Sequence, residues 1–534
     1  MRYIFITGGV VSSLGKGIVA ASLGKLLQAR GYKVTLQKFD PYLNVDPGTL
    51  NPYEHGEVFV TEDGTETDLD LGHYERFLGI STTRDHSVTT GRIYQTILER
   101  ERRGEYLGKT VQVIPHVTDE IKRRFTLLAQ REHYDIVLTE LGGTVGDIES
   151  LPYIEAARQL HYELGPTRVL FMHLTLIVYL AATQELKTKP TQHSVRELQR
   201  TGVQPDVLIC RTPRPLSREL RHKIALLTNV PRNAVIPVVD VPNIYLVPFQ
   251  LRKEKLDEVI LRRFRLPVRG EPDLSRWNAF IEGLQRPTRT VRIALVGKYV
   301  ELHDAYRSIQ EALTHASGWK AIQLEIAWVH SEEVTMENVG RLLRGVQGIL
   351  VAPGFGTRGI PGKLAAIFYA RTRQIPFLGI CLGMQMAVVE FAQNVLGWEG
   401  AHSTEVDPHT PYPVIDLLPE QRQIVRKGGT MRLGTYPCEL RPGSLAWRVY
   451  QTDRIYERHR HRYELNNAFR PALEEAGLHV SGYYPEKNLA EIIELSGHPF
   501  FIGVQFHPEF QSRVEVPHPL FSAFVEAAAQ YGSR

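Results

Sequence analysis

Short apolar runs alternate with longer amphipathic stretches along the first half of the chain. The run YIFIT leads into a glycine loop, and GIVAASLGKLLQARG at residues 17–31 has the pattern of a helix that ends at a glycine. Further apolar runs suited to buried strands occupy residues 33–39, 134–141, 168–178 and 205–210. This alternation predicts a doubly wound parallel sheet, in which ligands bind at the carboxyl ends of the strands.

A second alternation of the same kind begins near residue 290. Its apolar runs are VRIALVGKY, GILVAPGFG, IPFLGICLGMQ and FIGVQFHPEF. The stretch between the two halves is polar and contains several prolines, which is typical of a linker. We therefore predict an α/β protein with two doubly wound domains at residues 1–265 and 290–534, joined by a linker at residues 266–289.

The composition indicates which kinds of partner and which redox environment suit the protein. With 63 Lys and Arg against 59 Asp and Glu, the net charge is +4, which favours small-molecule partners over nucleic acid. Three cysteines without a CxxC pair argue against a disulfide framework or a zinc site, and fit a reducing, cytoplasmic setting. The chain opens on a strand-like run rather than a signal peptide, and its longest apolar run, residues 169–182, is short for a membrane span.

The motif GICLG in the second half places Cys381 between two glycines directly after an apolar run. This is the thiol form of a nucleophile elbow, a sharp strand-to-helix turn that exposes the side chain at its tip. The dipole of the following helix would favour the thiolate. A buried structural cysteine is the alternative interpretation of the motif taken alone.

The motif FHPEF supplies a candidate base. His507 and Glu509 are two residues apart, and Pro508 favours an extended conformation at His507. Residues i and i+2 of an extended chain point the same way, so the carboxylate can orient the imidazole. A surface turn is the alternative, but a cysteine elbow and His-x-Glu in one α/β domain together favour nucleophilic catalysis.

The segments PGFG, GICLGMQ and FHPE resemble class I glutamine amidotransferases. The resemblance implies hydrolysis of glutamine through a cysteinyl thioester, with Cys381 as nucleophile, His507 as base and Glu509 as its orienter. It also implies that the N–H groups of Gly354 and Leu382 form the oxyanion hole. The chain departs from the family pattern of Pro-Gly-Gly at Ala352-Pro353-Gly354, and a proline has no N–H to donate.

The loop GGVVSSLGKG at residues 8–17 follows a strand and opens a helix, as a phosphate-binding loop does. It departs from the usual motif in two ways. Five residues separate Gly9 from Gly15, and Gly17 stands where a magnesium-binding hydroxyl is normal. A tight strand-to-helix turn is the alternative. Lys16 would contact nucleotide phosphates, and Lys38 ends the next strand at the same sheet edge.

Magnesium at such a loop needs carboxylates from elsewhere. Asp68 and Asp70 lie in TDLDLGHYERF, and Glu140 ends a predicted strand. The segments GDIES and ELKTKPTQHS add further acids and lysines, and we interpret the second as an extended phosphate-binding segment. Solvated loops are the alternative for all of these residues.

Segments along nearly the whole chain resemble the CTP synthase family. They are YIFITGGVVSSLGKG, LNVDPGTLNPYEHGEVFVTEDGTETDLDLGHYERF, GGTVGDIESLP, FMHLTL, TKPTQHSV, GGTMRLG and ERHRHRYELNN. The resemblance implies an amidoligase domain that phosphorylates O4 of UTP with ATP and Mg²⁺, after which ammonia displaces phosphate to give CTP. It also implies activation by GTP, inhibition by CTP and a homotetramer. In that family a glycine after the lysine is normal.

The same resemblance assigns site residues by their place in the motifs. It implies ATP contacts from Ser13, Leu14, Gly15, Lys16, Gly17, Ile18, Asp70, Val239, Asp240 and Val241. It implies magnesium ligands from Asp70 and Glu140. It implies UTP or CTP contacts from Ser12, Asp147, Ile148, Glu149, Lys187, Thr188, Lys189, Pro190, Thr191, Gln192 and Lys223. It implies glutamine contacts from Gly354, Leu382, Gly383, Met384, Gln385, Glu405 and Arg462. It implies an ammonia passage lined by His55 and Val60, and a GTP contact from Arg358.

Three other classes fit parts of the sequence. An amidase-ligase of the cobyrinic acid or dethiobiotin type would share the ligase fold, but would not need TKPTQHS or TDLDLGHYERF. A nucleotide-switched assembly ATPase related to partitioning proteins would have no use for the Cys-His-Glu set. An inactive glutaminase that serves as a binding module conflicts with the intact set.

Overall fold

The computed structural model describes residues 1–418, 421 and 429–532. Their contacts divide the chain into two compact units. Unit 1 comprises Met1–Asp46 and Asp70–Ser275, and unit 2 comprises Pro47–Leu69 and Arg276–Arg534. None of the helices in this described part is long and apolar enough to cross a membrane.

Unit 1 is built on a seven-stranded sheet in the order β11-β10-β7-β1-β6-β2-β5, and every pairing in it is parallel. The strands are β1 (Arg2–Gly8), β2 (Val34–Asp40), β5 (Ser87–Thr89), β6 (Ile136–Leu141), β7 (Val169–Leu176), β10 (Val207–Thr212) and β11 (Val235–Val239). A separate hairpin pairs β8 (Val178–Leu180) with β9 (Glu185–Lys187). The central strands are buried on both faces, which explains their continuous apolar runs.

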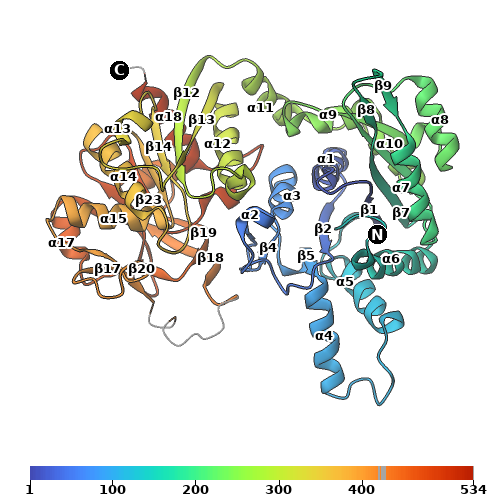
Figure 1. Cartoon of the computed structure of the whole chain (residues 1–534), viewed down its shortest axis with the longest axis horizontal. Coiled ribbons are helices and arrows are strands. Elements are labelled where there is room, and N and C mark those ends of the chain that lie inside the picture. Colours follow the sequence, from blue (N-terminus) through green and yellow to red (C-terminus); the bar gives the residue numbers. More distant parts are fainter. Residues whose placement is uncertain (419–420, 422–428, 533–534) are drawn as a thin grey trace. The chain divides into compact units, whose positions relative to one another are not determined.

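Helices cover both faces of this sheet (Figure 1). They are α1 (Lys16–Ala29), α3 (Asp70–Leu78), α4 (Thr90–Arg102), α5 (Thr118–Arg131), α6 (Leu151–Leu164), α7 (Lys189–Arg200), α8 (Arg218–Thr228), α9 (Val247–Lys253) and α10 (Leu256–Arg263). Tyr3 and Phe5 of β1 pack into one core with α4, α5 and α6. On the other face α1 contacts α3 and α9.

Unit 2 is built on a nine-stranded sheet in the order β13-β12-β14-β15-β23-β22-β21-β18-β19. The first five strands pair in parallel and the remaining pairings are antiparallel. The strands are β12 (Arg289–Gly297), β13 (Ile322–His330), β14 (Gly348–Val351), β15 (Phe377–Ile380), β18 (Arg432–Leu440), β19 (Arg454–His461), β21 (Leu478–Tyr484), β22 (Leu489–Leu495) and β23 (Phe501–Val504). A small sheet joins β16 (His402–Ser403), β17 (Pro413–Leu417) and β20 (Tyr463–Leu465).

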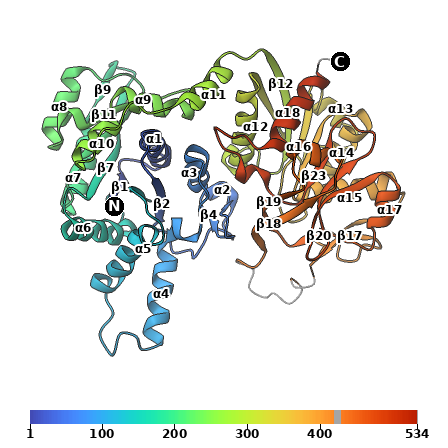
Figure 2. The same ribbon diagram turned by 180° about the vertical axis from the view of Figure 1, so that it is seen from behind.

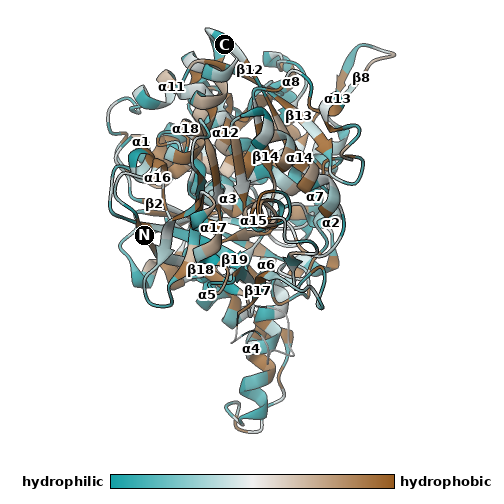
Figure 3. Cartoon of the chain, turned by 90° about the vertical axis from the view of Figure 1, so that its left-hand side faces the viewer, coloured by the Kyte–Doolittle hydropathy of each residue, from teal (hydrophilic) through white to brown (hydrophobic). Residues whose placement is uncertain are grey.

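Two apolar cores lie on opposite faces of the large sheet in unit 2. One holds side chains of α14 (Ile360–Arg373) and α15 (Leu382–Asn394), and the other those of α12 (Arg307–Trp319) and α18 (Pro519–Tyr531). Figure 2 shows these helix pairs beside β23, and Figure 3 shows that apolar residues concentrate on the strands and the inner sides of the helices. The shorter helices of this unit are α13 (Val339–Leu342), α16 (Leu445–Tyr450) and α17 (Arg470–Glu475).

The predicted linker is more ordered than its composition suggests. It contains α11 (Ser275–Gln285), whose Trp277 and Phe280 are fully buried. A Cβ at Gly283 would lie 1.9 Å from the carbonyl oxygen of Gly318, so α11 packs closely against α12 within unit 2. The prolines at both ends suggest a linker, and the short helical pattern between them corresponds to α11.

A segment from the first half of the chain belongs to unit 2 by its contacts. It is Pro47–Leu69, with α2 (Pro52–His55), β3 (Phe59–Val60) and β4 (Glu66–Thr67). Glu57 N donates to Asp304 O at 2.9 Å, and Thr435 N donates to Glu62 O at 3.0 Å. The predicted boundary at residue 265 did not anticipate this exchange, because the segment has almost no apolar periodicity of its own.

Candidate active sites

Cys381 sits on a sharp turn between β15 and α15. Its φ is 52° and its ψ is −105°, a region that a side chain rarely adopts. Its N–H donates to Val504 O at 2.7 Å, which ties the turn to β23. A Cβ at Gly379 would lie 2.8 Å from the backbone of Gly383, and one at Gly383 would lie 2.3 Å from Val351 O. Both glycines are therefore needed for the turn, as the elbow interpretation requires.

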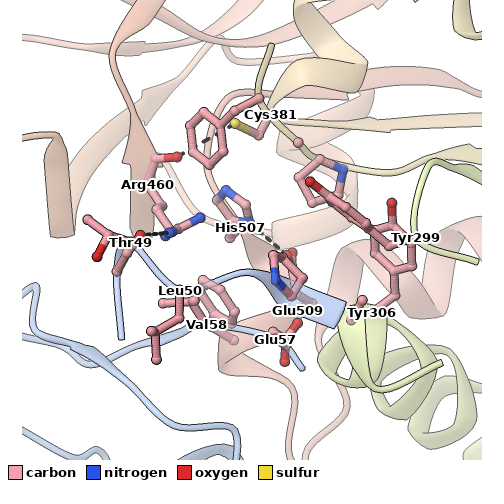
Figure 4. Close-up of a pocket in the computed structure, with 17 residues that line it drawn as sticks. Thr49, Leu50, Glu57, Val58, Tyr299, Tyr306, Cys381, Arg460, His507 and Glu509 are labelled. Carbon is pink, nitrogen blue, oxygen red and sulfur yellow. Dashed lines mark hydrogen bonds and ion pairs between the residues drawn. The ribbon is translucent and has the colours of Figure 1, made fainter. Parts of the chain in front are cut away.

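His507 and Glu509 are buried beside this turn. The carboxylate oxygen Oε1 of Glu509 lies 2.7 Å from Nδ1 of His507, and the ring of Phe510 stacks on the imidazole at 5.1 Å. Figure 4 shows the imidazole between the thiol and the carboxylate. Glu509 lies in a 3-10 turn over Pro508–Gln511, so the two side chains meet at the start of a turn rather than along an extended strand.

The surroundings of His507 favour its protonated form. Burial alone lowers the pKa, but the Glu509 carboxylate and contact with Cys381 outweigh it and raise the pKa of His507 to about 10. The ring nitrogen Nε2, opposite Glu509, is buried without a hydrogen-bond partner among the described residues. That nitrogen is free to exchange a proton with the thiol.

Two buried lysines that the sequence analysis missed hold the loop expected to form the oxyanion hole. Lys363 of α14 donates to Ala352 O at 2.5 Å, and Lys298 donates to Phe355 O. Burial and the neighbouring charge of Lys298 lower the pKa of Lys363 to about 7. The loop around Pro353 and Gly354 is thus fixed from both sides. Lys298 ends the apolar run VRIALVGK, and this polar end was its one signal in the sequence.

The residues expected to bind glutamine fall into two groups. Gly383, Met384 and Gln385 lie in the first turns of α15, directly after Leu382. Gln385 donates to Tyr463 O at 2.9 Å and to Oε1 of Gln505 at 3.2 Å, and Nε2 of Gln505 lies 3.7 Å from Cys381 Sγ. Gln505 was not predicted, although it stands in the same VQFHPE motif.

The second group consists of charged residues. Glu405 accepts a hydrogen bond from Gly356 N at 2.7 Å, and burial raises its pKa. Arg462 donates to Gln421 at 2.6 Å and to Thr430 at 3.0 Å. It is not among the residues of the described part that line the cavity at Cys381.

That cavity has a volume of about 230 Å³ and is reached by Cys381, His507 and Glu509. Its opposite side is formed by Tyr299 and Tyr306 together with six residues of the segment Pro47–Leu69, which are Gly48, Thr49, Leu50, Pro52, Glu57 and Val58 (Figure 4). Of the two residues expected along an ammonia passage, His55 ends α2 and Val60 is buried in β3. Within the described chain neither is among the residues that line this cavity.

The phosphate-binding loop of unit 1 joins β1 to α1, as its sequence context indicated. Val10 and Ser13 have positive φ values of 85° and 56°, and Gly15 has one of 94°. Lys16 opens α1, and its Nζ donates to Gly143 O at 2.5 Å. The loop therefore presents backbone groups and a lysine at the helix N-terminus, which suits a polyanion.

Gly17 is explained by the two carboxylates beside it. A Cβ at Gly17 would lie 2.5 Å from Oδ1 of Asp70 and 3.2 Å from Oε2 of Glu140. Asp70 also receives a hydrogen bond of 2.5 Å from Lys38, and Tyr74 donates to Glu140. The missing side chain is therefore what lets both acids approach the loop.

The two carboxylates have opposite pKa shifts. Burial, together with the charge of Asp70, raises the pKa of Glu140 to about 7. Burial also acts to raise the pKa of Asp70, but the charge of Lys38 outweighs burial and the pKa of Asp70 is lowered.

Magnesium prefers one or two carboxylates with phosphate oxygens and water, so the pair of Asp70 and Glu140 fits this ion. No cluster of three or more His, Cys, Asp or Glu suited to a metal occurs in the described part of the chain. Asp68 belongs by its contacts to unit 2.

The residues expected around the adenine base are linked to the phosphate-binding loop by an arginine. Val239 ends β11, and Asp240 follows it with Val241. Arg211 donates to Oδ1 of Asp240 at 2.8 Å and to Leu14 O at 3.2 Å. Arg211 was not predicted, because a single arginine at the end of an apolar run carries no motif.

The two lysines of ELKTKPTQHS lie only in part in the extended segment that was expected. Helix α7 begins at Lys189 with Pro190 in its first turn, and only Lys187 lies in a strand. A proline is well tolerated in the first turn of a helix, so the pattern fits a helix start equally well. Thr191 donates to Leu176 O at 3.0 Å, and Gln192 donates to Thr188 at 3.0 Å.

The remaining candidates for the pyrimidine nucleotide stay predictions. They are Ser12 on the phosphate-binding loop, Asp147, Ile148 and Glu149 after β6, and Lys223 on α8. Ile148 is 79% exposed, and Asp147 accepts a hydrogen bond from Thr144 N at 3.1 Å.

Comparison with known proteins identifies the family. A model described as CTP synthase N-terminus matches residues 2–266, and one described as class-I glutamine amidotransferase matches residues 301–527. The CTP synthase of Cytophaga hutchinsonii is 59% identical over 99% of this chain and 98% of its own length. This chain belongs to the CTP synthase family.

A second sequence relative agrees with that membership. The CTP synthase of Caldanaerobacter subterraneus subsp. tengcongensis is 58% identical over 98% of each chain. A solved structure of the Trypanosoma brucei CTPS glutaminase domain with bound acivicin is 36% identical, and the match covers 45% of this chain and 94% of that chain with a TM-score of 0.43. Membership of the CTP synthase family rests on the sequence relatives.

A buried histidine within an apolar run connects two predicted nucleotide-binding segments of this family member. His173 of β7 pairs through Nδ1 with Thr7 at 2.8 Å and through Nε2 with Ser194 of α7 at 2.7 Å. A Cβ at Gly9 would lie 1.7 Å from Oγ of Ser194. Helix α7 thus packs directly against the phosphate-binding loop.

Proposed function

We propose that this protein aminates UTP to CTP with ATP, using ammonia that it releases from glutamine. One observation supports this above the others. A single chain carries a Cys-His-Glu set in unit 2 and a phosphate-binding loop with two carboxylates in unit 1. Neither an assembly ATPase nor an inactive glutaminase would need both.

In unit 2, Cys381 attacks the amide carbon of glutamine, and His507 takes the thiol proton. Its raised pKa suits the imidazolium that results, and Glu509 holds that cation in place. His507 then gives the proton to the leaving ammonia, and a thioester remains on Cys381. Water hydrolyses the thioester to glutamate and restores the thiol.

In unit 1, O4 of UTP attacks the γ-phosphorus of ATP and ADP leaves. Ammonia then attacks C4, and phosphate leaves to give CTP. Phosphorylation turns a poor leaving group into a good one. Lys16 and the loop N–H groups would neutralise and position the phosphates. Magnesium held by Asp70 and Glu140 would supply further charge neutralisation.

We further propose that GTP activates glutamine hydrolysis and that CTP inhibits the enzyme. Arg358 is the proposed GTP contact. It pairs with Glu332 at 2.8 Å, and its guanidinium lies 5.9 Å from the ring of Tyr299, which lines the cavity at Cys381. A ligand that displaced Glu332 from Arg358 would therefore act close to the nucleophile.

We propose a homotetramer as the assembled form. Large apolar side chains are exposed on α4 and on the chain between α4 and α5, which project from the sheet of unit 1 (Figure 1). They are Leu98, Leu107, Val113 and Ile114, which are 61%, 88%, 44% and 53% exposed. A run of exposed apolar residues of this kind marks an interaction surface.

The direct test mixes the protein with UTP, ATP, magnesium and ammonium. We expect the absorbance change from uracil to cytosine, and the same change with glutamine in place of ammonium. Release of glutamate from glutamine is the control for active protein. Glutamate release without any change in the pyrimidine would contradict the proposal and favour an amidase-ligase that acts on another substrate.

A further inference from the structure

One wall of the cavity at Cys381 comes from a part of the chain far from the glutaminase motifs in sequence. The wall consists of six residues between Gly48 and Val58, and Arg460 lies where this wall meets the catalytic residues (Figure 4). The six are Gly48, Thr49, Leu50, Pro52, Glu57 and Val58. Arg460 belongs to β19. Arg458 of the same strand donates to Val60 O at 3.0 Å. Strand β19 therefore holds the segment Pro47–Leu69 through two arginines on the same side.

Arg460 contacts the nucleophile and the wall at the same time. Its carbonyl oxygen lies 3.8 Å from Sγ of Cys381. Its Nε lies 2.8 Å from Oε1 of Glu66, its Nη2 donates to Gly48 O at 3.2 Å, and its guanidinium lies 5.0 Å from the ring of Phe355. A shift of the guanidinium would move the wall while the peptide backbone at Cys381 stayed in place.

Glu66 packs behind the wall, against Gly48, without spare room. Its side chain is 2% exposed, and the second carboxylate oxygen, Oε2, has no hydrogen-bond partner among the described residues. A Cβ at Gly48 would lie 2.0 Å from that oxygen, so the carboxylate fills the space that any side chain at position 48 would need. The direct ion pair of Glu66 is with Arg460, and the charge of Arg462 also acts on it, so loss of the pair would leave a buried carboxylate without its nearest cation.

We propose that the Arg460–Glu66 ion pair fixes the wall between Gly48 and Val58 over Cys381, and so keeps newly released ammonia from escaping into water. Glu66 is then a positioning residue for the coupling of glutamine hydrolysis to CTP formation. This inference rests on the proposed function. Ammonia that reaches bulk water takes up a proton, and its nitrogen lone pair is no longer available to attack C4 of the pyrimidine.

The test compares two variants of the full chain with a control. Glu66→Gln removes the charge of the pair and keeps its shape. Gly48→Ala keeps both charges and displaces the carboxylate, so it guards against a failure of the first variant to fold. Glu439→Gln is the matched control. Glu439 of β18 pairs at 2.5 Å with Arg454, which lies on β19 as Arg460 does, and this pair is at the surface. Each protein is assayed for glutamate release, for CTP from glutamine and for CTP from ammonium.

We expect the ratio of CTP formed to glutamate released to fall at least threefold in both variants, with CTP formation from ammonium within twofold of the unmodified protein and the control unchanged. An unchanged ratio in folded variants would overturn the inference, as would an equal loss of both activities that leaves the ratio intact. If the unmodified protein releases glutamate but forms no CTP from either nitrogen source, the proposed function fails instead.

Discussion

At the scale of single residues, Gly17 shows how one missing side chain defines a site. The phosphate-binding loop lacks the hydroxyl that normally follows its lysine, and the space next to that position is filled by Asp70 and Glu140. Asp70 of α3 and Glu140 of β6 can therefore bind the metal in place of the missing hydroxyl. A departure from a motif can therefore mark a different solution to the same chemical need.

Restoring the usual residue at position 17 should harm the enzyme. In Gly17→Ser the new Cβ would lie within 2.5 Å of Oδ1 of Asp70 and displace it. We expect at least a tenfold loss of CTP formation from either nitrogen source, measured by absorbance, with glutamate release retained. Equal or higher CTP formation in this variant would contradict the placement of the carboxylates.

Cys381→Ala should separate the two reactions. Loss of the nucleophile should reduce CTP formation from glutamine by at least a thousandfold, while formation from ammonium stays within twofold. Cys438→Ala is a matched control, because Cys438 is buried in the same sheet away from the elbow. Loss of both activities in a folded Cys381→Ala protein would show that the two reactions are not divided in this way.

The His507–Glu509 pair should contribute stability that depends on pH. The folded pKa of His507, about 10, lies above the ordinary value of 6.5, so the contribution is complete below pH 6.5 and is lost as the pH rises through 10. Breaking a buried pair costs about 3 kcal/mol. We expect Glu509→Gln to melt below the unmodified protein at pH 6, and the gap in Tm to close toward pH 10. A gap that widened with pH would contradict the assignment.

At the scale of elements, helix α14 is fastened to the loop after β14 by one buried lysine. Lys363 donates to Ala352 O, directly before Pro353 and Gly354. Because that loop is expected to supply an oxyanion donor, the position of the helix sets the position of the donor. The proline that replaces the family's usual glycine removes one N–H but stiffens the same loop.

Lys363→Met should reduce glutamine hydrolysis by about tenfold or more, because the loop loses its anchor and the oxyanion donor its place. The effect should fall on kcat rather than on KM for glutamine, and CTP formation from ammonium should not change. Steady-state glutamate release measures the first and absorbance the second. A selective rise in KM would indicate a role in binding glutamine instead.

Much of this element structure could be predicted from the sequence. Most strands of the parallel sheet in unit 1 and of the parallel part of the sheet in unit 2 are short apolar runs. The glycine loops between strand and helix predicted the elbow at Cys381 and the loop before Lys16. Two elements were missed for a physical reason. The contacts of Pro47–Leu69 are with residues distant in sequence, and the first turn of α7 tolerates the proline that suggested an extended chain.

The same limit applies to the side chains at the sites. Cys381, His507 and Glu509 stand in motifs and could be found there, and the structure brings them together. Lys363, Gln505 and Arg211 instead contact atoms that are distant in sequence. Such contacts leave no local pattern, so they become visible only in three dimensions.

At the scale of the whole molecule, two sets of reactive groups serve a single product. Lys16→Ala should stop CTP formation from glutamine and from ammonium alike, because phosphoryl transfer loses its cation. Glutamate release from glutamine should persist, since Cys381 and His507 lie in the other unit. Normal CTP formation from ammonium in this variant would contradict the proposed ATP site.

The path of the backbone between the two units has a consequence for how such a protein can be recombined. The chain passes from one unit to the other at residues 46–47, 69–70 and 275–276. A chimera made with a single crossover near residue 270 would therefore combine a glutaminase with a cavity wall that came from a different parent. Functional exchange of the glutaminase between relatives should require transplanting Pro47–Leu69 together with it.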